Sequence, residues 1–396
     1  MDFIGFDLGT SSIKAVRWNR QDGIVAKSSR KAPMQYPAEN QVEMDAEEYL
    51  SLVTDILAEL AAVPGEPIAA IAMAAASGNT VLCSPEDSKP LTPIISWLDK
   101  RLDWRPPSDW NTRETSGWPC GGTFPLMHLE YFRRTCPELL DSARIAMSND
   151  LITWRLTGKH VLDYSSGTPF YLINQKERRY EKKYLEHYGI TEDRLPSLAD
   201  TGTPVGRLLP RYVTGCLTPE TIVAAGSFDH PAAALASGVT QYGDILLSCG
   251  TSWVVFAPVP NRDTVPLSEL ADPFLSASGG CWGAISSLAY IGIEIDKFVH
   301  DHFGEDSGCY ARFEEESKDK NSPAAAFMLD VVTRFKAKTK NHHIERAVMT
   351  GGPSNSPTWI RYMEEELNIK ITTSPYHDHA GSVGAAMIAE RAVHQS

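Results

Sequence analysis

Short apolar runs alternate with turns at the start of the chain. Residues 4–7, 13–18 and 24–28 are rich in apolar and β-branched side chains, and segments rich in small or polar residues separate them at 8–12 and 19–23. Short runs bounded by Gly, Ser, Asn and Asp are typical of β-strands joined by turns. The pattern therefore predicts three successive strands.

A helical period follows these strands. Apolar side chains at 50, 53, 56, 57 and 60 share one face of a helix, which Asp45 can cap and Glu48 can complete as a capping box. Pro64 and Gly65 end it, and residues 68–76 form the next apolar strand. Strands and helices alternate through the rest of the chain, so the predicted fold class is α/β.

One pattern occurs twice. IGFDLGTSSIKAVRW begins at Ile4 and ILLSCGTSWVVFAPV begins at Ile245, and each is an apolar strand, Gly-Thr-Ser and a second apolar strand. A Gly-Thr-Ser tripeptide alone could recur by chance. The whole strand–turn–strand unit favours a duplicated chain, divided near residues 238–243 into an N-terminal part (1–238) and a C-terminal part (239–396).

The two repeated turns have the chemistry of a phosphate site. The chain lacks G-x-x-x-x-G-K-[ST], G-x-G-x-x-G after a strand, and the H-R-D and D-F-G kinase motifs. Glycine allows close approach of the backbone to an anion, and Thr and Ser hydroxyls add donors. Asp7 ends the first strand, where a Mg²⁺ ion bridging to phosphates would compensate its charge. The alternative is an Asp that makes a local turn hydrogen bond.

A strand-to-helix junction carries a candidate base. In TIVAAGSFDHPAAALASGV, residues 221–239, an apolar strand leads to Asp229, and Pro231 opens a helix of small residues. Ligands of open α/β sheets bind where strands end at their carboxyl edge. Asp229 could instead be an ordinary helix N-cap.

The segment RAVMTGGPSNSPTWIRYMEEEL, from Arg346, has a strand, a Gly351-Gly352 turn and a helix. A flat base can lie against a Gly-Gly backbone, although an ordinary strand-to-helix turn would read the same. The closing helix, residues 381–394, is rich in small residues at 384–386, which favours close packing.

Charge and cysteine content indicate which partners the protein can bind and in which compartment it lies. The net charge of −13 argues against binding to nucleic acid or to an anionic membrane. No apolar run approaches the ~18 residues of a membrane span, and no signal peptide is visible. The seven cysteines, Cys120 among them, are widely spaced and without C-x-x-C, as expected of free thiols. We therefore expect a cytoplasmic protein.

Taken together, these segments resemble the FGGY family of carbohydrate kinases. The opening IGFDLGTSSIKAV is similar to its first phosphate motif, LSCGTSW to its second, and MTGGPSNSPTW to its adenosine motif. AAGSFDH resembles the segment of the catalytic Asp, and LTPIISWLDKR resembles a substrate-side segment. SNDLITWRLTGKHVLDYSSGT and SVGAAMIAE match two further family segments, in the family's order.

The resemblance implies two actin-like (ribonuclease H-like) lobes around a nucleotide cleft, with ATP and Mg²⁺ as cofactors and a small sugar or polyol as substrate. It implies that Asp229 takes the proton of a substrate hydroxyl. The implied phosphate and nucleotide residues are Gly9, Thr10, Ser11, Ser12, Lys14, Gly250, Thr251, Ser252, Gly351, Gly352, Ser354 and Asn355. The implied substrate residues are Ser77, Gly78, Asn79, Trp97, Asp99 and His230, and the metal residues are Asp7 and Asp229. A core position is the alternative for Trp97, and a homodimer is compatible with the resemblance.

The chain also departs from the family pattern. His230 follows the catalytic position where Gln is usual, and Ser77-Gly78-Asn79 stands where glycerol kinases have Arg-Glu and xylulokinases Met-His. The region between Trp282 and Arg346 is unusually short and lacks a G-E-R-x-P segment. Two alternatives therefore stay open: a catalytically weak relative that binds sugar or nucleotide as a regulator, and an actin- or chaperone-like ATPase without a sugar substrate.

Overall fold

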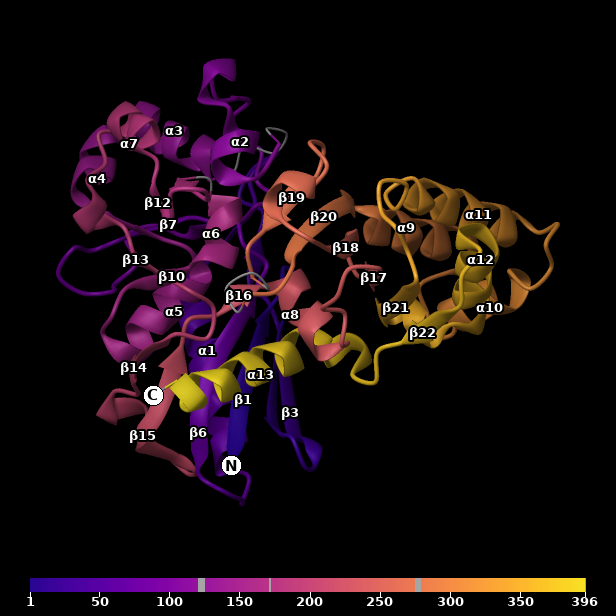
Figure 1. Cartoon of the computed structure of the whole chain (residues 1–396), viewed down its shortest axis with the longest axis horizontal. Helices are drawn as coiled ribbons and strands as arrows, with labels where there is room; N and C mark the ends of the chain where they lie inside the picture. The colour runs from indigo at the N-terminus through magenta and orange to yellow at the C-terminus, as the bar shows by residue number, and fades with distance from the viewer. Residues whose placement is uncertain (120–124, 171, 275–278, 396) are drawn as a thin grey trace.

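The computed structural model describes residues 1–119, 125–170, 172–274 and 279–395 and contains two large sheets (Figure 1). The first sheet has the strand order β14-β15-β6-β1-β2-β3, with β16 beside β6. Its strands are β1 (Asp2–Leu8), β2 (Ser12–Asn19), β3 (Gly23–Lys31), β6 (Ile68–Ala75), β14 (Pro204–Arg207), β15 (Leu217–Ala224) and β16 (Ser227–Phe228). The predicted strands at 4–7, 13–18, 24–28 and 68–76 are confirmed as β1, β2, β3 and β6.

The predicted first helix is α1 (Ala46–Ala62). The side chain of Asp45 accepts the N–H of Glu48 at 2.8 Å, which confirms the predicted cap. Its apolar face packs in one core with β1, β2 and β6, and this core fixes the position of the β1–β2 turn.

The second sheet repeats the centre of the first. Its order is β19-β20-β18-β17-β21-β22. The strands are β17 (Asp244–Cys249), β18 (Trp253–Val259), β19 (Leu270–Asp272), β20 (Trp282–Leu288), β21 (Arg346–Gly351) and β22 (Ile371–Thr373). β17 pairs antiparallel with β18 and parallel with β21, just as β1 pairs with β2 and β6. The predicted α/β duplication is thus present as two sheets with matching central strands.

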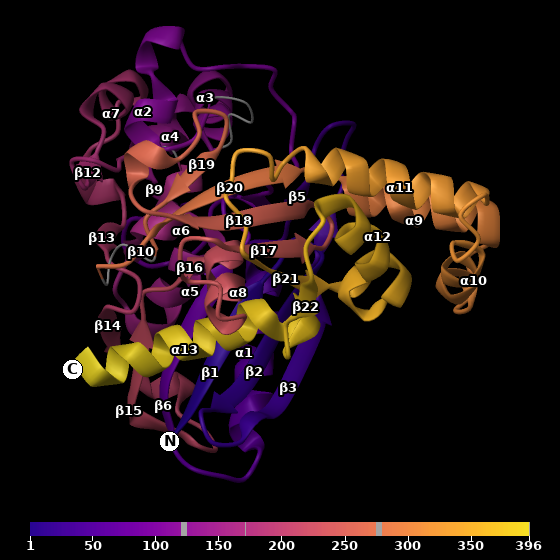
Figure 2. The same ribbon diagram turned by 45° about the vertical axis from the view of Figure 1, so that its right-hand side comes forward.

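Two helices pack between the sheets and share a core with both of them. α8 (Asp229–Ala236) and α13 (Ala380–Gln395) pack against each other, and their small residues join one core with side chains of both sheets. Figure 2 shows α13 lying along β1 and β6, although it follows the second sheet in the chain. The approach is close: a Cβ on Gly384 would lie 1.9 Å from the Ala232 carbonyl oxygen. The predicted small-residue packing is confirmed, and α13 covers the sheet of the opposite half.

The remaining elements flank these layers. α9 (Ile291–Phe303), α10 (Cys309–Glu316), α11 (Pro323–Lys336) and α12 (Pro357–Leu367) gather beside the second sheet, on the right in Figure 1. The region between the first sheet's strands contains α2 (Thr112–Ser116), α3 (Leu126–Thr135), α4 (Pro137–Ser142), α5 (Ser148–Thr157), α6 (Tyr164–Phe170) and α7 (Lys182–Tyr188). Short strands complete it: β4 (Met34–Gln35), β5 (Glu43–Met44), β7 (Val81–Cys83), β8 (Ile94–Ile95), β9 (Arg144–Ala146), β10 (Val161–Asp163), β11 (Ile173–Asn174), β12 (Arg179–Tyr180) and β13 (Ser197–Ala199).

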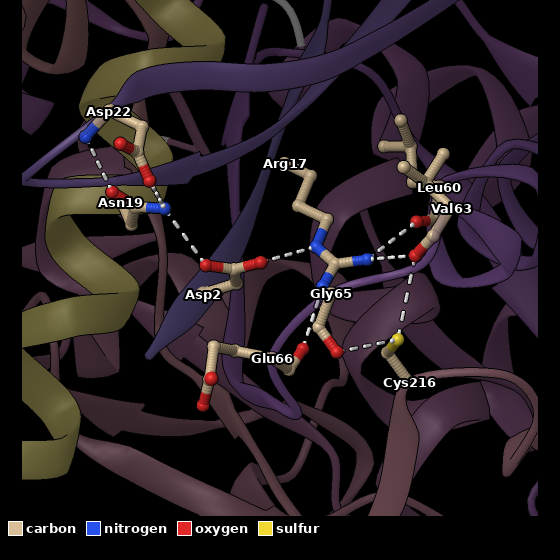
Figure 3. Close-up of polar contacts among 9 residues, drawn as sticks. All are labelled: Asp2, Arg17, Asn19, Asp22, Leu60, Val63, Gly65, Glu66 and Cys216. Atoms are coloured by element: carbon tan, nitrogen blue, oxygen red, sulfur yellow. Dashed lines mark hydrogen bonds and ion pairs between the residues drawn. The ribbon is translucent and has the colours of Figure 1, made fainter.

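A buried ion pair fastens the first hairpin at the end opposite to its turn (Figure 3). Arg17 is fully buried, and its Nε donates to Asp2 Oδ2 at 2.6 Å. The remaining guanidinium nitrogens donate to backbone carbonyls that include Val63 and Glu66, after α1. Removing any of these partners would leave the buried guanidinium charge of Arg17 without a hydrogen bond, which is energetically costly. The bonds therefore hold β1, β2 and the α1–β6 connection in one arrangement.

The six cysteines among the described residues are free, as predicted, and Cys120 lies outside the described residues. No helix in the described part of the chain combines the length and apolar character that crossing a membrane requires.

Candidate active site

A cavity of about 1010 Å³ lies between the two sheets and brings together most of the predicted site. Its first-half lining includes Asp7, Gly9, Thr10, Ser11, Ser12, Lys14, Ser77, Trp97, Asp99, Asp229 and His230. Its second-half lining includes Gly250, Thr251, Ser252, Gly351 and Gly352. Gly78, Asn79, Ser354 and Asn355 do not line it.

The two Gly-Thr-Ser turns meet at one side of this cavity. The hydroxyl oxygens of Ser11 and Thr251 are 3.5 Å apart, although 240 positions separate the residues in the chain. Each turn joins two antiparallel strands, so both present backbone and hydroxyl groups from the same kind of rigid hairpin. The arrangement offers hydrogen-bond donors to an anion from two sides.

Two carboxyl groups share the cavity near the first turn. Withdrawal from water raises the pKa of Asp229 to about 7, and the N–H of His230 bound at 2.8 Å opposes this rise. The pKa of Asp7 is also raised to about 7, first by burial and then by the charge of Asp229. Phe228 occupies the N-cap of α8 and Asp229 is the first helical residue, so the N-cap interpretation of Asp229 is wrong in position.

Lys14 supplies positive charge beside these acids. It lies opposite Asp7 in the β1–β2 ladder, and its Nζ is 3.1 Å from Asp378 Oδ2. The pair holds the pKa of Asp378 below its usual value against the effect of burial. Sequence reasoning missed Asp378, because nothing in the chain order links a short turn before the last helix to β2.

Trp97 links the cavity wall to both turns. Its indole Nε1 donates to Thr10 Oγ1 at 2.8 Å, and its ring stacks on Tyr290 with centroids 6.0 Å apart. The N–H of Tyr290 in turn donates to Ser252 Oγ at 3.2 Å. Trp97 is only partly buried and borders the cavity, unlike a core tryptophan. Tyr290 was not predicted, and the short α9 connection gives no sequence signal for it.

The other predicted substrate residues divide into two groups. Ser77 borders the cavity, and so does His230, whose pKa burial lowers to about 4. Asp99 also borders it, but its carboxylate already accepts bonds from Arg101 and from the Val42 N–H at 2.7 Å. Contact of Asp99 with a substrate hydroxyl would compete with these bonds.

Asn79, the last residue of the turn that follows Ser77, has a structural role. The side chain of Asn79 accepts the N–H of Ser148 at 2.8 Å and donates to its hydroxyl at 3.0 Å. Asn79 thereby fastens the turn to the start of α5. Gly78 has φ +94°, which favours glycine, and the turn can direct Ser77 toward the cavity.

A second cavity of about 710 Å³ adjoins the Gly-Gly turn. It lies among α9, α10 and the start of α12, borders Asn355, and shares Gly250, Thr251 and Gly352 with the first cavity. Gly351 has φ +91°, and a Cβ there would lie 2.1 Å from the Cys249 carbonyl oxygen, so the turn depends on glycine. The hydroxyl of buried Ser354 closes the turn by donating to Gly351 O at 2.7 Å.

Two matching sheets around a shared cleft define the actin-like, two-lobed class of α/β protein. The chain belongs to the FGGY family of carbohydrate kinases: residues 3–236 match the N-terminal domain of that family.

Curated relatives include a gluconokinase of Bacillus subtilis, 27% identical over 64% of this chain and 51% of the relative. A xylulose kinase of the same organism is 27% identical over 64% of this chain and 53% of the relative. The chain thus aligns with about half the length of these proteins. The crystal structure of a ligand-bound xylulose kinase from Lactobacillus acidophilus superposes with a TM-score of 0.86 at 18% identity, over 100% of this chain and 90% of that one.

Proposed function

We propose that this protein transfers the γ-phosphate of ATP to a hydroxyl of a small sugar or polyol, with Asp229 as general base. The observation that carries the proposal is the convergence of both Gly-Thr-Ser turns, Asp7 and Asp229 on one cavity. Family membership supports the same class of reaction.

The nucleotide would lie along the two turns. The phosphates would take donors from residues 9–12 and 250–252, and the base and ribose would enter the second cavity beside Gly351, Gly352, Ser354 and Asn355. Phosphoryl transfer depends mainly on positioning and charge stabilisation, which two rigid hairpins can provide. Lys14 would neutralise phosphate charge while Asp378 keeps its ammonium group in place.

Asp229 would accept the proton of the attacking hydroxyl. Its pKa near 7 suits a group that must be ionised to accept a proton and still be basic enough to hold it. Burial lowers the pKa of His230 to about 4, so its ring is neutral near neutral pH, and its Nε2, 3.6 Å from Asp229 Oδ1, places no positive charge beside the carboxylate.

The site residues also fit a magnesium ion. Asp7 and Asp229 are like charges whose mutual repulsion a cation would relieve, and Mg²⁺ bound with ATP would neutralise charge on the transferring phosphate. No group of three ligating His, Cys, Asp or Glu side chains occurs among the described residues. Mg²⁺ commonly needs only one or two carboxylates besides phosphates and water, so Asp7 and Asp229 suffice for this proposal.

The substrate would enter between Trp97, Ser77 and Asp229. Trp97 would form an apolar wall for the carbon skeleton, and Ser77 and His230 would meet hydroxyl groups. Gluconokinase and xylulose kinase among the relatives make sugar acids and ketopentoses the first substrates to test.

Sugar-dependent release of ADP tests the proposal. Purified protein with Mg-ATP should turn over one or more members of a panel of sugar acids, pentuloses, hexuloses, polyols and glycerol. Sugar or nucleotide binding without turnover across the panel would favour the regulatory alternative. ATP hydrolysis that no sugar stimulates would favour the chaperone-like alternative.

A further inference from the structure

The segment from Asp163 to Thr168 resembles the family but has no part in the proposed chemistry. It forms the end of β10 and the start of α6, and α6 packs against β16, the strand that leads into Asp229. Ser165 on α6 is 1% exposed and lies beside β16.

A chain of hydrogen bonds runs from this serine in two directions. The N–H of Phe228 donates to Ser165 Oγ at 3.1 Å, and the Ser165 hydroxyl donates to Asp272 Oδ2 at 2.8 Å. Phe228 immediately precedes Asp229. One hydroxyl therefore uses both its acceptor and its donor to connect the backbone beside the proposed base to a buried acid.

Asp272 is fully buried at the end of β19. Its other oxygen accepts the N–H of Phe274 at 2.8 Å, and no ion pair reaches its carboxylate within the described ranges. Burial, with smaller effects from Asp163 and Asp229, raises its pKa to about 7. A buried acid with so few donors depends strongly on each of them, so loss of the Ser165 hydroxyl would disturb it directly.

The contact also joins the two halves of the molecule. β19 belongs to the second sheet, yet the N–H of Ala271 donates to Gly117 O at 2.8 Å and Gln175 Nε2 donates to Ala271 O at 2.7 Å. Ser165–Asp272 is the part of this joint that touches the strand before Asp229. A shift of one half against the other would therefore move Ser165 and alter its hydrogen bond with the Phe228 N–H.

We propose that Ser165, held by Asp272, is a positioning residue that fixes the backbone at Phe228 and so aims the Asp229 carboxylate at the substrate. The proposal rests on the proposed kinase function. It assigns no contact with substrate to Ser165 or Asp272.

Ser165→Ala is the direct test. Residues that hydrogen-bond to metal ligands and orient them typically change activity by about 10–100-fold when mutated, and we expect a fall of the same size in kcat here, while the KM values for ATP and sugar change little. Gln175→Ala is the control, because it removes the bonds of Gln175 to Ala271, to Thr168 on α6 and from Arg262, and leaves the Ser165–Phe228 bond in place. It should lower the thermal midpoint but leave kcat close to that of the unaltered chain.

Asp272→Asn provides a second variant. If the two residues act as one device, the double variant Ser165→Ala/Asp272→Asn should lose no more kcat than the worse single variant. Additive losses, or a Ser165→Ala enzyme with unchanged kcat, would overturn the proposal. Equal losses of kcat in Ser165→Ala and Gln175→Ala would also overturn it in favour of a purely structural joint.

Amide hydrogen exchange gives a readout independent of turnover. Ser165→Ala should speed exchange at Phe228 relative to the unaltered chain, and Gln175→Ala should not. Unchanged exchange at Phe228 in a folded Ser165→Ala variant would contradict the contact itself. If the unaltered chain shows no sugar-dependent turnover, the kinase function fails, and the exchange result still decides whether Ser165 fixes this backbone.

Discussion

The two Gly-Thr-Ser hairpins have the same backbone plan and different chemistry. Counting from each glycine, Asp7 of the first corresponds to Ser248 of the second, and Lys14 corresponds to Val255. Lys14 forms an ion pair with Asp378, whereas Val255 is fully buried in an apolar core. The charges of the site are therefore concentrated on one of two otherwise matching turns.

The elements that pack against the two turns also differ. The second turn rests on the start of α9, where Gly292 N–H donates to Thr251 O at 2.9 Å, and on a core that includes Trp253. The first rests on α13, where a Cβ on Gly381 would lie 2.6 Å from Asp7 Oδ2. Both turns thus offer hydrogen-bond donors, but Asp7 and Lys14 flank the first whereas Ser248 and Val255 flank the second, and variants at these matched positions can test that division.

The largest effect should come from Asp229→Asn. Loss of a general base typically costs ~10²–10⁴ in rate, so kcat should fall at least that far while ATP still binds. Steady-state kinetics and nucleotide titration measure both quantities. Asn keeps the size of the side chain, so near-normal turnover would remove Asp229 from the mechanism.

Asp7→Ser gives the first hairpin the residue of the second. If Asp7 holds Mg²⁺ as proposed, loss of its carboxylate should lower activity by at least about 10–100-fold and raise the Mg²⁺ concentration needed for half-maximal rate. The matched variant Ser248→Ala changes the equivalent position and should have a much smaller effect. Equal losses in the two variants would contradict the division between the hairpins.

Trp97→Ala removes a cavity wall that bonds Thr10 of the first turn and stacks on Tyr290 beside the second. Burial of a large apolar side chain contributes about 1.5–3 kcal/mol, and about 1.4 kcal/mol is a factor of ten in affinity, so we expect a rise of roughly tenfold in the sugar KM, larger than the rise for ATP. Trp97→Phe keeps an aromatic ring but loses the bond to Thr10. Its sugar KM should lie between those of the unaltered chain and Trp97→Ala. A parallel rise in both KM values with a lowered thermal midpoint would support a core role.

The smallest effect concerns stability against pH. In the folded chain the pKa of Asp7 is about 7, above its ordinary value near 3.8, so between these values the folded state holds a proton that the unfolded state has lost. Stability from this group is therefore present at low pH and lost as pH rises through about 7. Without Mg²⁺, the unaltered chain should lose stability relative to Asp7→Ser between about pH 4 and 7, as denaturant unfolding can measure.

The sequence predicted the elements better than their assembly. The opening strands, the Asp45 cap and the small-residue helix are local patterns, and the structure has them at the expected residues. Asp378, Tyr290 and Asp272 were missed because their partners lie far away in the chain. Asp99 and Asn79 were predicted from their positions in family motifs. A motif position does not show that the polar atoms of these side chains already form hydrogen bonds within the protein, as they do with Arg101 and Ser148.

The position of α13 has a consequence for how the protein is made. The strands it covers, β1 and β6, leave the ribosome hundreds of residues before the helix itself. Until residues 380–395 emerge, the alanine-rich face of that sheet has no cover, and Gly5 faces solvent where the Ser382 backbone will later lie. The apolar face of the first sheet is thus covered by a segment that is synthesised about 300 residues later, and a chain truncated before residue 380 should expose it.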